Sequence, residues 1–247
     1  LLERCPHLRV SGFHMHLQSQ LLDEDALSQY YFRSFSFFDR IARSLDIEPE
    51  FLNFGSGIGL AYDQLQERDL DLEKLGAAFE KHQGKFERLA HAQSFIETGR
   101  FVACRAGTYF TPVVDVKASR GKTYVIVRNG VNGFLRPAIA HLIVANNAQA
   151  RDLQEPFYTN RHAFQLKAYK ADGTLLTEPS KRVDVVGNLC TALDVVAADV
   201  ELASVKPGDL ICISNAGSYA YSLSPLAFSS HEPPKQAYLL EDGELKC

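Results

Sequence analysis

The chain has 247 residues, of which 46% are hydrophobic and 23% are charged, and its formal net charge is −4. This size and apolar content suit one large or two ordinary folded domains, and a weakly negative chain gives no reason to expect nucleic acid or an anionic membrane as a partner. No apolar run approaches the ~20 residues that span a bilayer, and the five cysteines are scattered without a CxxC pair. We therefore expect a cytoplasmic globular protein without a disulfide framework or a zinc site.

The first hundred residues alternate between short apolar runs and amphipathic segments. Strands are expected over residues 8–16, 51–53 and 94–96, and apolar side chains recur at helical spacing over 23–45 and 72–92. Strand–helix alternation of this kind predicts the parallel sheet of an α/β fold or barrel. Polar residues follow the carboxyl ends of these strands, which is where α/β barrels build their sites.

After about residue 105 the sequence changes to β-rich runs that are separated by glycine-containing turns. The strand-like runs cover residues 109–118, 123–128, 163–169, 183–186 and 210–214. The tail, residues 237–246, is typical of a hairpin that turns at Asp242-Gly243. We therefore predict two domains, a partial α/β barrel over 1–104 and a mainly antiparallel β-barrel or sandwich over 105–247.

Three glycines within five residues mark the stretch that follows the second expected strand. Gly55, Gly57 and Gly59 let the backbone approach a ligand closely and turn its N–H groups toward an anion. The spacing matches neither the dinucleotide fingerprint nor a P-loop, because no Gly-Lys-Ser/Thr follows. From these residues alone, an anion-binding loop and a simple tight turn both stay open.

Several polar side chains have both a functional and a structural interpretation. His14 and His16 lie two residues apart on an expected strand and so face the same side, either as working residues or with one packed in the core. Glu97 and Arg100 follow another strand. They either form a surface ion pair, which contributes little to stability, or face a bound charged ring. Cys190 also follows a strand, although most single cysteines are inert buried residues.

Six motifs in chain order resemble one family, the diaminopimelate/ornithine decarboxylases, which are pyridoxal-phosphate (PLP) enzymes with an alanine-racemase-like (type III) fold. The motifs are residues 12–20, 53–59, 97–100, 136–138, 187–194 and 216–222. The resemblance implies a PLP-binding (β/α)8 barrel followed by a β domain. It also implies an amino-acid-like small-molecule substrate and a homodimer with shared active sites.

The resemblance further implies which residues contact the cofactor. His16 would stack on its ring, and Glu97 would face the pyridine nitrogen and keep it protonated, so that the ring accepts the electron pair released with CO2. The phosphate and its surroundings would be held by other residues, namely Ser19, the N–H groups of Gly55, Ser56 and Gly57, together with Gly99, Arg100 and Tyr219.

For the substrate, the resemblance implies that Cys190 reaches across from the partner subunit and returns a proton to Cα after CO2 leaves. Cys190, His16 and Glu97 are therefore the expected catalytic residues. Arg136 aligns with an arginine that binds the distal carboxylate in the diaminopimelate branch. Further substrate contacts are implied for Arg100, Thr191, Asp194 and Tyr219.

Two departures from the family's motifs bear on the substrate. Thr191 stands where the family carries an acidic residue for the far amino group of the substrate, and Ala140 replaces a substrate-facing tyrosine. A threonine does not pair with a distal ammonium by charge, so a conjugated amino acid of carboxylate-siderophore assembly is favoured over free diaminopimelate, lysine or ornithine. The other departures keep shape or hydrogen-bonding capacity: Gln18 for Gly, Asn53 for Asp, Ser56 for Gly and Thr98 for Pro.

The family's Schiff-base lysine belongs to a V-K-A-N-like motif on the first barrel strand. The similar stretch Val116-Lys117-Ala118-Ser119 comes after the Glu97 motif, so we expect Lys117 to be structural, on a strand of the β domain. Three strand–helix units do not close a barrel of the usual ~250 residues. We therefore expect the lysine and the N-terminal part of the barrel upstream of this chain.

Two alternatives of other kinds remain from the sequence. An antizyme-inhibitor-like relative would keep the fold, lose the cofactor and act by binding a partner, but Cys190 and Glu97 are both retained here. A racemase of the same fold type would lack the motif at residues 187–194. Both observations favour a decarboxylase.

Overall fold

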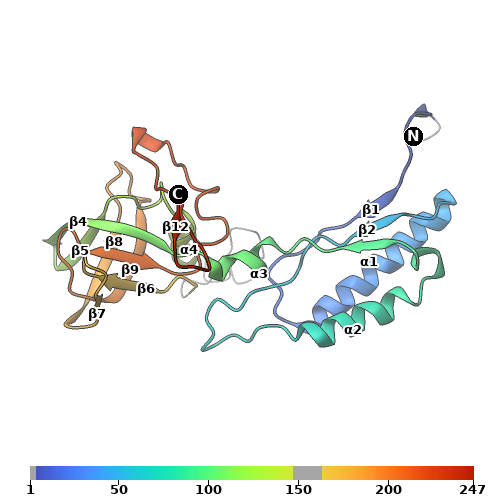
Figure 1. The fold of residues 1–247 in the computed structure, drawn as a ribbon, viewed down its shortest axis with the longest axis horizontal. Coiled ribbons are helices and arrows are strands. Elements are labelled where there is room, and N and C mark those ends of the chain that lie inside the picture. The colour runs from blue at the N-terminus through green and yellow to red at the C-terminus, as the bar shows by residue number, and fades with distance from the viewer. Residues whose placement is uncertain (1–3, 147–162) are drawn as a thin grey trace. The chain divides into compact units, whose positions relative to one another are not determined.

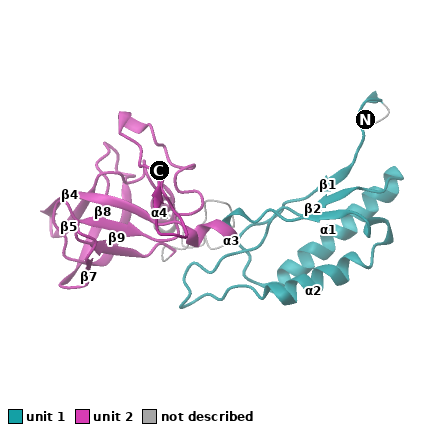
Figure 2. Ribbon diagram, viewed as in Figure 1, with its two compact units in different colours: residues 1–101, 154–156 teal, residues 102–153, 157–247 magenta. Residues whose placement is uncertain are grey.

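The computed structural model describes residues 4–146 and 163–247. Contacts divide the described residues into two compact units, which meet in the chain between residues 101 and 102 (Figure 2). We call residues 4–101 unit 1 and the described residues from 102 onward unit 2.

Unit 1 is built on a three-stranded parallel sheet (Figure 1). The strands lie in the order β1 (Gly12–His14), β2 (Phe51–Asn53) and β3 (Gln93–Phe95). Helix α1 (Glu24–Leu45) connects β1 to β2, and helix α2 (Leu72–Gln83) lies between β2 and β3 in the chain. The parallel sheet that the strand–helix alternation predicts is therefore confirmed.

Helix α1 begins and ends at identifiable residues. Asp23 is its N-cap, and the Asp23 carboxylate accepts the N–H groups of Asp25 and Ala26 at 2.9 Å each, which satisfies two of the donors that a helix start leaves unpaired. The helix ends where Asp46 adopts a left-handed conformation (φ 47°). The predicted helix over residues 23–45 is thus confirmed to within one residue.

The core of unit 1 lies between α1 and the sheet. Leu27, Tyr31, Phe35 and Phe38 recur every three or four residues along α1, and each is at most 1% exposed. Their partner Phe54 directly follows β2, and its ring centroid lies 4.6 Å from that of Phe35. Because Phe54 is fully buried, α1 fixes the point at which the chain enters the glycine-rich loop.

Two predicted elements of unit 1 are shorter in the structure. The strand expected over residues 8–16 pairs only over β1, since its regular partners on β2 are Phe51 to Asn53. The helix expected over residues 72–92 ends at Gln83, because Gly84 caps it and a short 3-10 helix, η2 (Glu87–Leu89), follows. Glycine costs about 1 kcal/mol relative to alanine inside a helix, so Gly84 favours this ending.

Helix α2 is joined to α1 by a contact that depends on pH. His82 Nε2 lies 2.9 Å from the Ser28 hydroxyl, and its ring lies 5.2 Å from that of Phe32. Partial burial, reinforced by Lys85 and Lys81, lowers the pKa of His82 below its usual 6.5. In the unfolded chain, His82 therefore binds a proton more readily than in the folded protein. The contribution of neutral His82 to the free energy of unfolding is complete above about pH 6.5 and is lost as the pH falls through the folded-state pKa.

We predict that His82→Gln reduces the loss of unfolding free energy that the protein shows between pH 7.5 and pH 5. Glutamine keeps a polar contact to Ser28 but carries no titrating group. Urea unfolding at the two pH values measures the effect, and His91→Gln, at an exposed position of the same unit, is the matched control. An equal loss in wild type and His82→Gln would contradict the prediction.

Unit 2 is built on a seven-stranded sheet in the order β7-β6-β10-β4-β5-β8-β9 (Figure 1). Its strands are β4 (Tyr109–Ser119), β5 (Lys122–Val127), β6 (Leu166–Tyr169), β7 (Leu175–Leu176), β8 (Ser180–Val186), β9 (Val195–Ala203) and β10 (Leu210–Ile213). All neighbours are antiparallel except β5 and β8, which run parallel. Strand β6 also contacts β9, so the sheet curls upon itself.

Helix α4 (Arg136–Asn146) and strands β7 and β9 of unit 2 were not predicted from the sequence. Helix α4 lacks an amphipathic pattern because its described start is buried almost all round, with Ala138 and Ala140 each 1% exposed. The expected hairpin in the tail is confirmed: β11 (Tyr238–Leu239) pairs with β12 (Leu245–Lys246), and Gly243 takes the left-handed conformation of the turn (φ 85°).

Lys117 lies on β4, opposite Tyr124 of β5, and is exposed. The expectation that it belongs to a strand of the β domain is confirmed. No helix within the described residues is both long and apolar enough to cross a membrane.

Candidate active site

In unit 1, the His16 ring lies on the glycine-rich loop. Strand β1 ends at His14, so His16 is free of the sheet. Its Nδ1 accepts the N–H of Ser56 at 3.2 Å, and its Nε2 lies 3.2 Å from the Ser19 hydroxyl. Because Nδ1 acts as an acceptor, the proton of the neutral ring belongs to Nε2, which donates to Ser19. Three residues that the sequence assigned to the cofactor are thus brought together.

The loop keeps its shape through glycine and through a neighbouring segment. Gly55 has φ of 62°, and a Cβ there would collide with the His16 ring. On the other side, the N–H of Leu21 donates to the carbonyl of Gly57 at 2.9 Å, and the carbonyl of Leu21 accepts the N–H of Gly59 at 2.8 Å. Gln20 adds two bonds from its side-chain amide to the backbone of Leu60. These hydrogen bonds between residues 20–21 and 57–60 were not predicted, because no local sequence pattern indicates a contact between segments so far apart in the chain.

Glu97 lies beside the same loop. Asn53 donates its side-chain N–H to Glu97 Oε1 at 2.9 Å, and the Glu97 backbone N–H donates to the Gly55 carbonyl at 2.6 Å. The N–H of Gly55 donates to Asn53 Oδ1 at 2.8 Å. The Gly55 amide, which the resemblance assigned to the phosphate, thus donates within the loop in this structure.

The next motif residues begin the short helix α3 (Gly99–Ala103). Arg100 is 9% exposed, so its guanidinium is largely enclosed rather than part of an open surface pair. A Cβ on Gly99 would meet no atom within 4 Å. Gly99 is therefore not required by close packing within the described residues.

In unit 2, Asp194 organises the loop that carries Cys190 and Thr191. The Asp194 carboxylate is 3% exposed and accepts the N–H groups of Val131 at 2.8 Å and Leu189 at 2.9 Å. Asp194 therefore orders the loop in the structure, and its contact with substrate stays a prediction. Cys190 on this loop is exposed, and Thr191 is partly buried.

Arg136 is the largest fully buried side chain among the described residues of unit 2, with 0% of it exposed. Its guanidinium donates to the carbonyl of Ser218 at 3.2 Å and lies over the rings of Phe164 and Tyr219, at 5.3 and 6.0 Å from their centroids. The structure thus brings Arg136 and Tyr219 together, as the sequence predicted for one site.

The loop before Tyr219 is held by close backbone packing. Gly217 donates its N–H to the carbonyl of Cys104 at 2.9 Å, and Ala216 donates to that of Gly107, also at 2.9 Å. A Cβ on Gly217 would collide with the carbonyl of Ala103. Tyr219 itself has a positive φ of 56°, a strained conformation that surrounding contacts must hold and that is common at functional sites.

One further polar residue was not singled out from the sequence. Asn132 is 0% exposed, and neither polar atom of its side chain has a hydrogen-bond partner within the part of the chain that the structure describes. Buried polar groups of this kind are rare and costly. In the sequence, only its position four residues before Arg136, inside a glycine-containing turn, could have indicated Asn132 as a candidate site residue.

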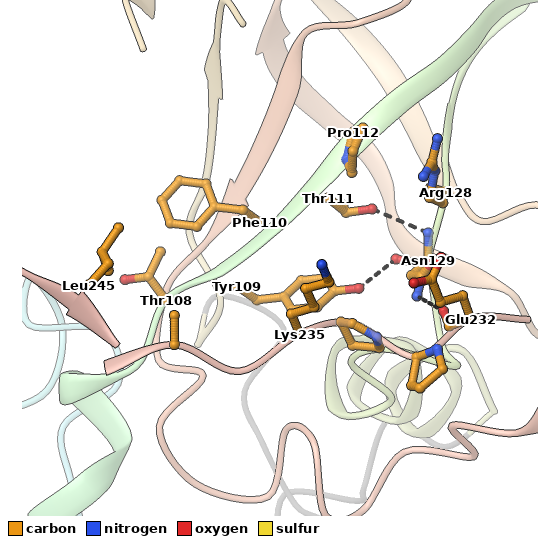
Figure 3. Close-up of a pocket in the computed structure, with 13 residues that line it drawn as sticks. Thr108, Tyr109, Phe110, Thr111, Pro112, Arg128, Asn129, Glu232, Lys235 and Leu245 are labelled. Atoms are coloured by element: carbon orange, nitrogen blue, oxygen red, sulfur yellow. Dashed lines mark hydrogen bonds between the residues drawn. The ribbon is translucent and has the colours of Figure 1, made fainter. Parts of the chain in front are cut away.

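A pocket of about 540 Å³ lies in unit 2 between the start of β4 and the C-terminal segment (Figure 3). Asn129 joins its two sides, since its side chain donates to the carbonyl of Glu232 at 3.0 Å and its carbonyl accepts the Tyr109 hydroxyl at 2.9 Å. The lining residues include none of those that the motifs assigned to the active site. We therefore treat this pocket as separate from the candidate site.

Comparison with known proteins gives consistent results. The chain is 28% identical over 225 residues to a decarboxylase of Niallia circulans that acts on an L-glutamyl group on the BtrI acyl-carrier protein, covering 90% of this chain and 49% of that protein. It is also 28% identical to a Staphylococcus aureus decarboxylase of a 2-hydroxybutanedioate that bears an L-alanin-3-ylcarbamoylmethyl group, covering 97% of this chain and 56% of that protein. The chain thus spans about half the length of the curated relatives it matches.

Solved structures agree on the fold. The diaminopimelate decarboxylase of M. jannaschii superposes with a TM-score of 0.76 at 20% identity, over 100% of this chain and 52% of that one. A variant of the Helicobacter pylori diaminopimelate decarboxylase, in complex with L-lysine, gives a TM-score of 0.69 at 26% identity over 95% of this chain and 50% of that one.

The family model for the C-terminal sheet domain of pyridoxal-dependent decarboxylases matches residues 30–217, more than half of the chain. The match agrees with the six motifs, with the loop on which His16, Ser56 and Glu97 meet, and with the cofactor that these motifs imply. The chain belongs to the family of pyridoxal-dependent decarboxylases.

Proposed function

We propose that the protein is a PLP-dependent carboxy-lyase that acts on an amino acid whose far end is conjugated or acidic, as in siderophore intermediates. The observation that carries the proposal is the meeting of His16, Ser19, Ser56 and Glu97 around Gly55. PLP, when bound, would supply an electron sink for the pair left behind by CO2. The residues present fit such a group, since they offer hydroxyl and amide donors to a phosphate and a carboxylate to a ring nitrogen.

The loop has a clear way to accept an anion. The Ser56 amide donates to His16 Nδ1, and a phosphate oxygen would replace that nitrogen as a stronger, charged acceptor. The His16 ring would then be released to lie against the cofactor ring, while Ser19 would turn its hydroxyl from His16 to the phosphate. The left-handed conformations of Gly55 and Gly57 favour such an anion-binding concavity.

We infer that β1–β3 are part of a (β/α)8 barrel. One face of this sheet is covered by the helices, whereas the other carries Phe51 and Phe95, 36% and 43% exposed, with ring centroids 6.1 Å apart. Barrel strands need a covered interior, and the relatives are about twice as long as this chain. Lys117 pairs within the β sheet of unit 2, which supports a structural role for this lysine.

We assign the return of a proton to Cα to Cys190. Its thiol is exposed on a loop that Asp194 holds rigid from within, which is what a group presented to another subunit requires. The proposal therefore includes a homodimer in which each site combines Glu97 of one subunit with Cys190 of the other. All five cysteines are free thiols, which supports the proposed cytoplasmic location.

The far end of the substrate is assigned to Thr191 and Arg136. Neither offers a negative charge, and an ammonium buried without one is costly. The Staphylococcus aureus relative acts on an alanine joined through a neutral amide to carboxylates, and the Niallia circulans relative acts on a carrier-bound glutamyl group. Both support a conjugated substrate for this protein.

A diaminopimelate or basic amino-acid decarboxylase is the second candidate. Diaminopimelate decarboxylases of Methanothermobacter thermautotrophicus and others share 24–28% identity with the chain, and Arg136 is common to both interpretations. The identities to the two groups are too similar to separate them. The charge at position 191 is therefore the feature to test.

We predict that wild-type protein decarboxylates an amide-linked citryl amino acid faster than free lysine, ornithine or diaminopimelate. Thr191→Glu should raise kcat/KM for free lysine about tenfold or more relative to the conjugate, because it adds a charge-assisted partner for the distal ammonium. CO2 release measures both, and Thr177→Glu, at an exposed position of unit 2, controls for the added charge. Faster turnover of free lysine than of every acidic or conjugated substrate by wild type would contradict the assignment.

A further inference from the structure

Asn53, the last residue of β2, connects the glycine-rich loop to Glu97. Its side-chain oxygen accepts the N–H of Gly55 at 2.8 Å, and its side-chain nitrogen donates to Glu97 Oε1 at 2.9 Å. A third bond closes the ring, because the Glu97 N–H donates to the Gly55 carbonyl at 2.6 Å. The three residues form one hydrogen-bonded unit.

The orientation of the Asn53 amide follows from its partners. A backbone N–H only donates, so the atom that faces Gly55 must be the oxygen, and the nitrogen then faces the carboxylate. An ionised aspartate would accept from Gly55 equally well but would have nothing to donate to Glu97. This position is asparagine here, where the motif that the loop resembles has aspartate.

We propose that Asn53 is a positioning residue for Glu97: its amide fixes the carboxylate next to the phosphate loop, where it would face the cofactor ring nitrogen. The inference rests on the proposed function, since the charge of Glu97 matters to catalysis only if it faces the cofactor.

An aspartate at this position would have the opposite effect. Its second oxygen would occupy the place of the asparagine nitrogen, 2.9 Å from Glu97 Oε1, and two carboxylates so close do not both ionise readily. The other titratable or charged groups around the pair are His14, opposite Asn53 on β1, His16 on the loop and Arg100 after Glu97. These are unchanged in the variant, so a difference from wild type reports on the 53–97 pair.

The first measurement is stability and needs no cofactor. In urea unfolding, Asn53→Asp should lower the folded-to-unfolded ratio relative to wild type by about tenfold at pH 8, which corresponds to a shift of about one unit in a carboxyl proton affinity, and by less than about twofold at pH 4, where the carboxyl groups are largely protonated in both states. Adding Glu97→Gln should restore the ratio at pH 8, because the glutamine nitrogen donates to Asp at 53 and re-forms the bond in reverse. Gln236→Glu, exposed in unit 2, adds the same charge elsewhere and should show neither effect.

The second measurement uses pyridoxamine 5′-phosphate, which carries the ring and phosphate of PLP but forms no covalent bond to lysine. Asn53→Asp should move the pH midpoint of the bound ring's absorbance by about one unit. The double variant should recover stability but not the wild-type spectrum, since glutamine does not hold the ring proton as an anion.

Two results would overturn the inference. One is an Asn53→Asp protein that matches Gln236→Glu in stability at every pH, and the other is a double variant no more stable than Asn53→Asp alone. A wild-type protein that binds no pyridoxamine 5′-phosphate while the stability cycle behaves as expected would instead contradict the proposed function, and with it the catalytic half of the inference.

Discussion

Replacing Gly55 by alanine is expected to weaken the binding of pyridoxamine 5′-phosphate about 100-fold, equivalent to about 2.8 kcal/mol. The new methyl group would collide with the His16 ring, and the left-handed backbone at this position (φ 62°) is strained for any residue with a Cβ. The ring and the loop would therefore separate, and the Ser56 amide would lose its present direction. Titration calorimetry measures the loss.

The matched control is Gly76→Ala on α2. A Cβ there meets nothing within 4 Å, and alanine in an exposed helix interior is more stable than glycine by roughly 1 kcal/mol. This variant should unfold at a higher urea concentration and bind the ligand as wild type does. Unchanged affinity in Gly55→Ala would show that the loop does not hold the phosphate.

The parts of the fold that the sequence predicted well have a local signal. Helix α1 has its capping Asp23, and its apolar residues from Leu27 to Phe38 repeat on one face, so both its bounds and its buried side follow from the sequence. Helix α4 has no such signal, because its start is apolar on all sides and begins at a buried arginine, Arg136. Helix α2 ends early at Gly84, whereas the helical spacing of apolar residues continues beyond this glycine and so does not indicate the end.

The candidate site shows the same division. Residue types at motif positions identified His16, Ser56 and Glu97, which the structure brings to one loop. Their hydrogen-bond partners were not predictable, because Asn53 accepts the amide of Gly55 and Asp194 accepts the amide of Val131, 63 residues away in the chain. A motif indicates which side chains gather, whereas the distribution of donors depends on the folded backbone.

Replacing Cys190 by alanine is expected to lower kcat by about 10²–10⁴-fold, the range for removing a proton-transfer group, while leaving ligand affinity and stability nearly unchanged. The side chain is exposed and its loop is held by Asp194 instead, so the change removes chemistry and little packing. Steady-state kinetics with calorimetry separates the two effects. Cys247→Ala, the other cysteine exposed in unit 2, is the matched control and should be fully active.

Mixed dimers then test whether the site is shared. If Cys190 of one subunit serves Glu97 of the other, a dimer of Cys190→Ala with Glu97→Ala contains one site with both groups intact and one with neither. Random mixing of equal amounts gives such dimers half of the time, so activity should rise from near zero to about a quarter of wild type. Heterodimers that form, as shown by differential tagging, but stay inactive would place Cys190 and Glu97 in the same subunit's site. An unaffected rate in Cys190→Ala alone would remove the thiol from the reaction.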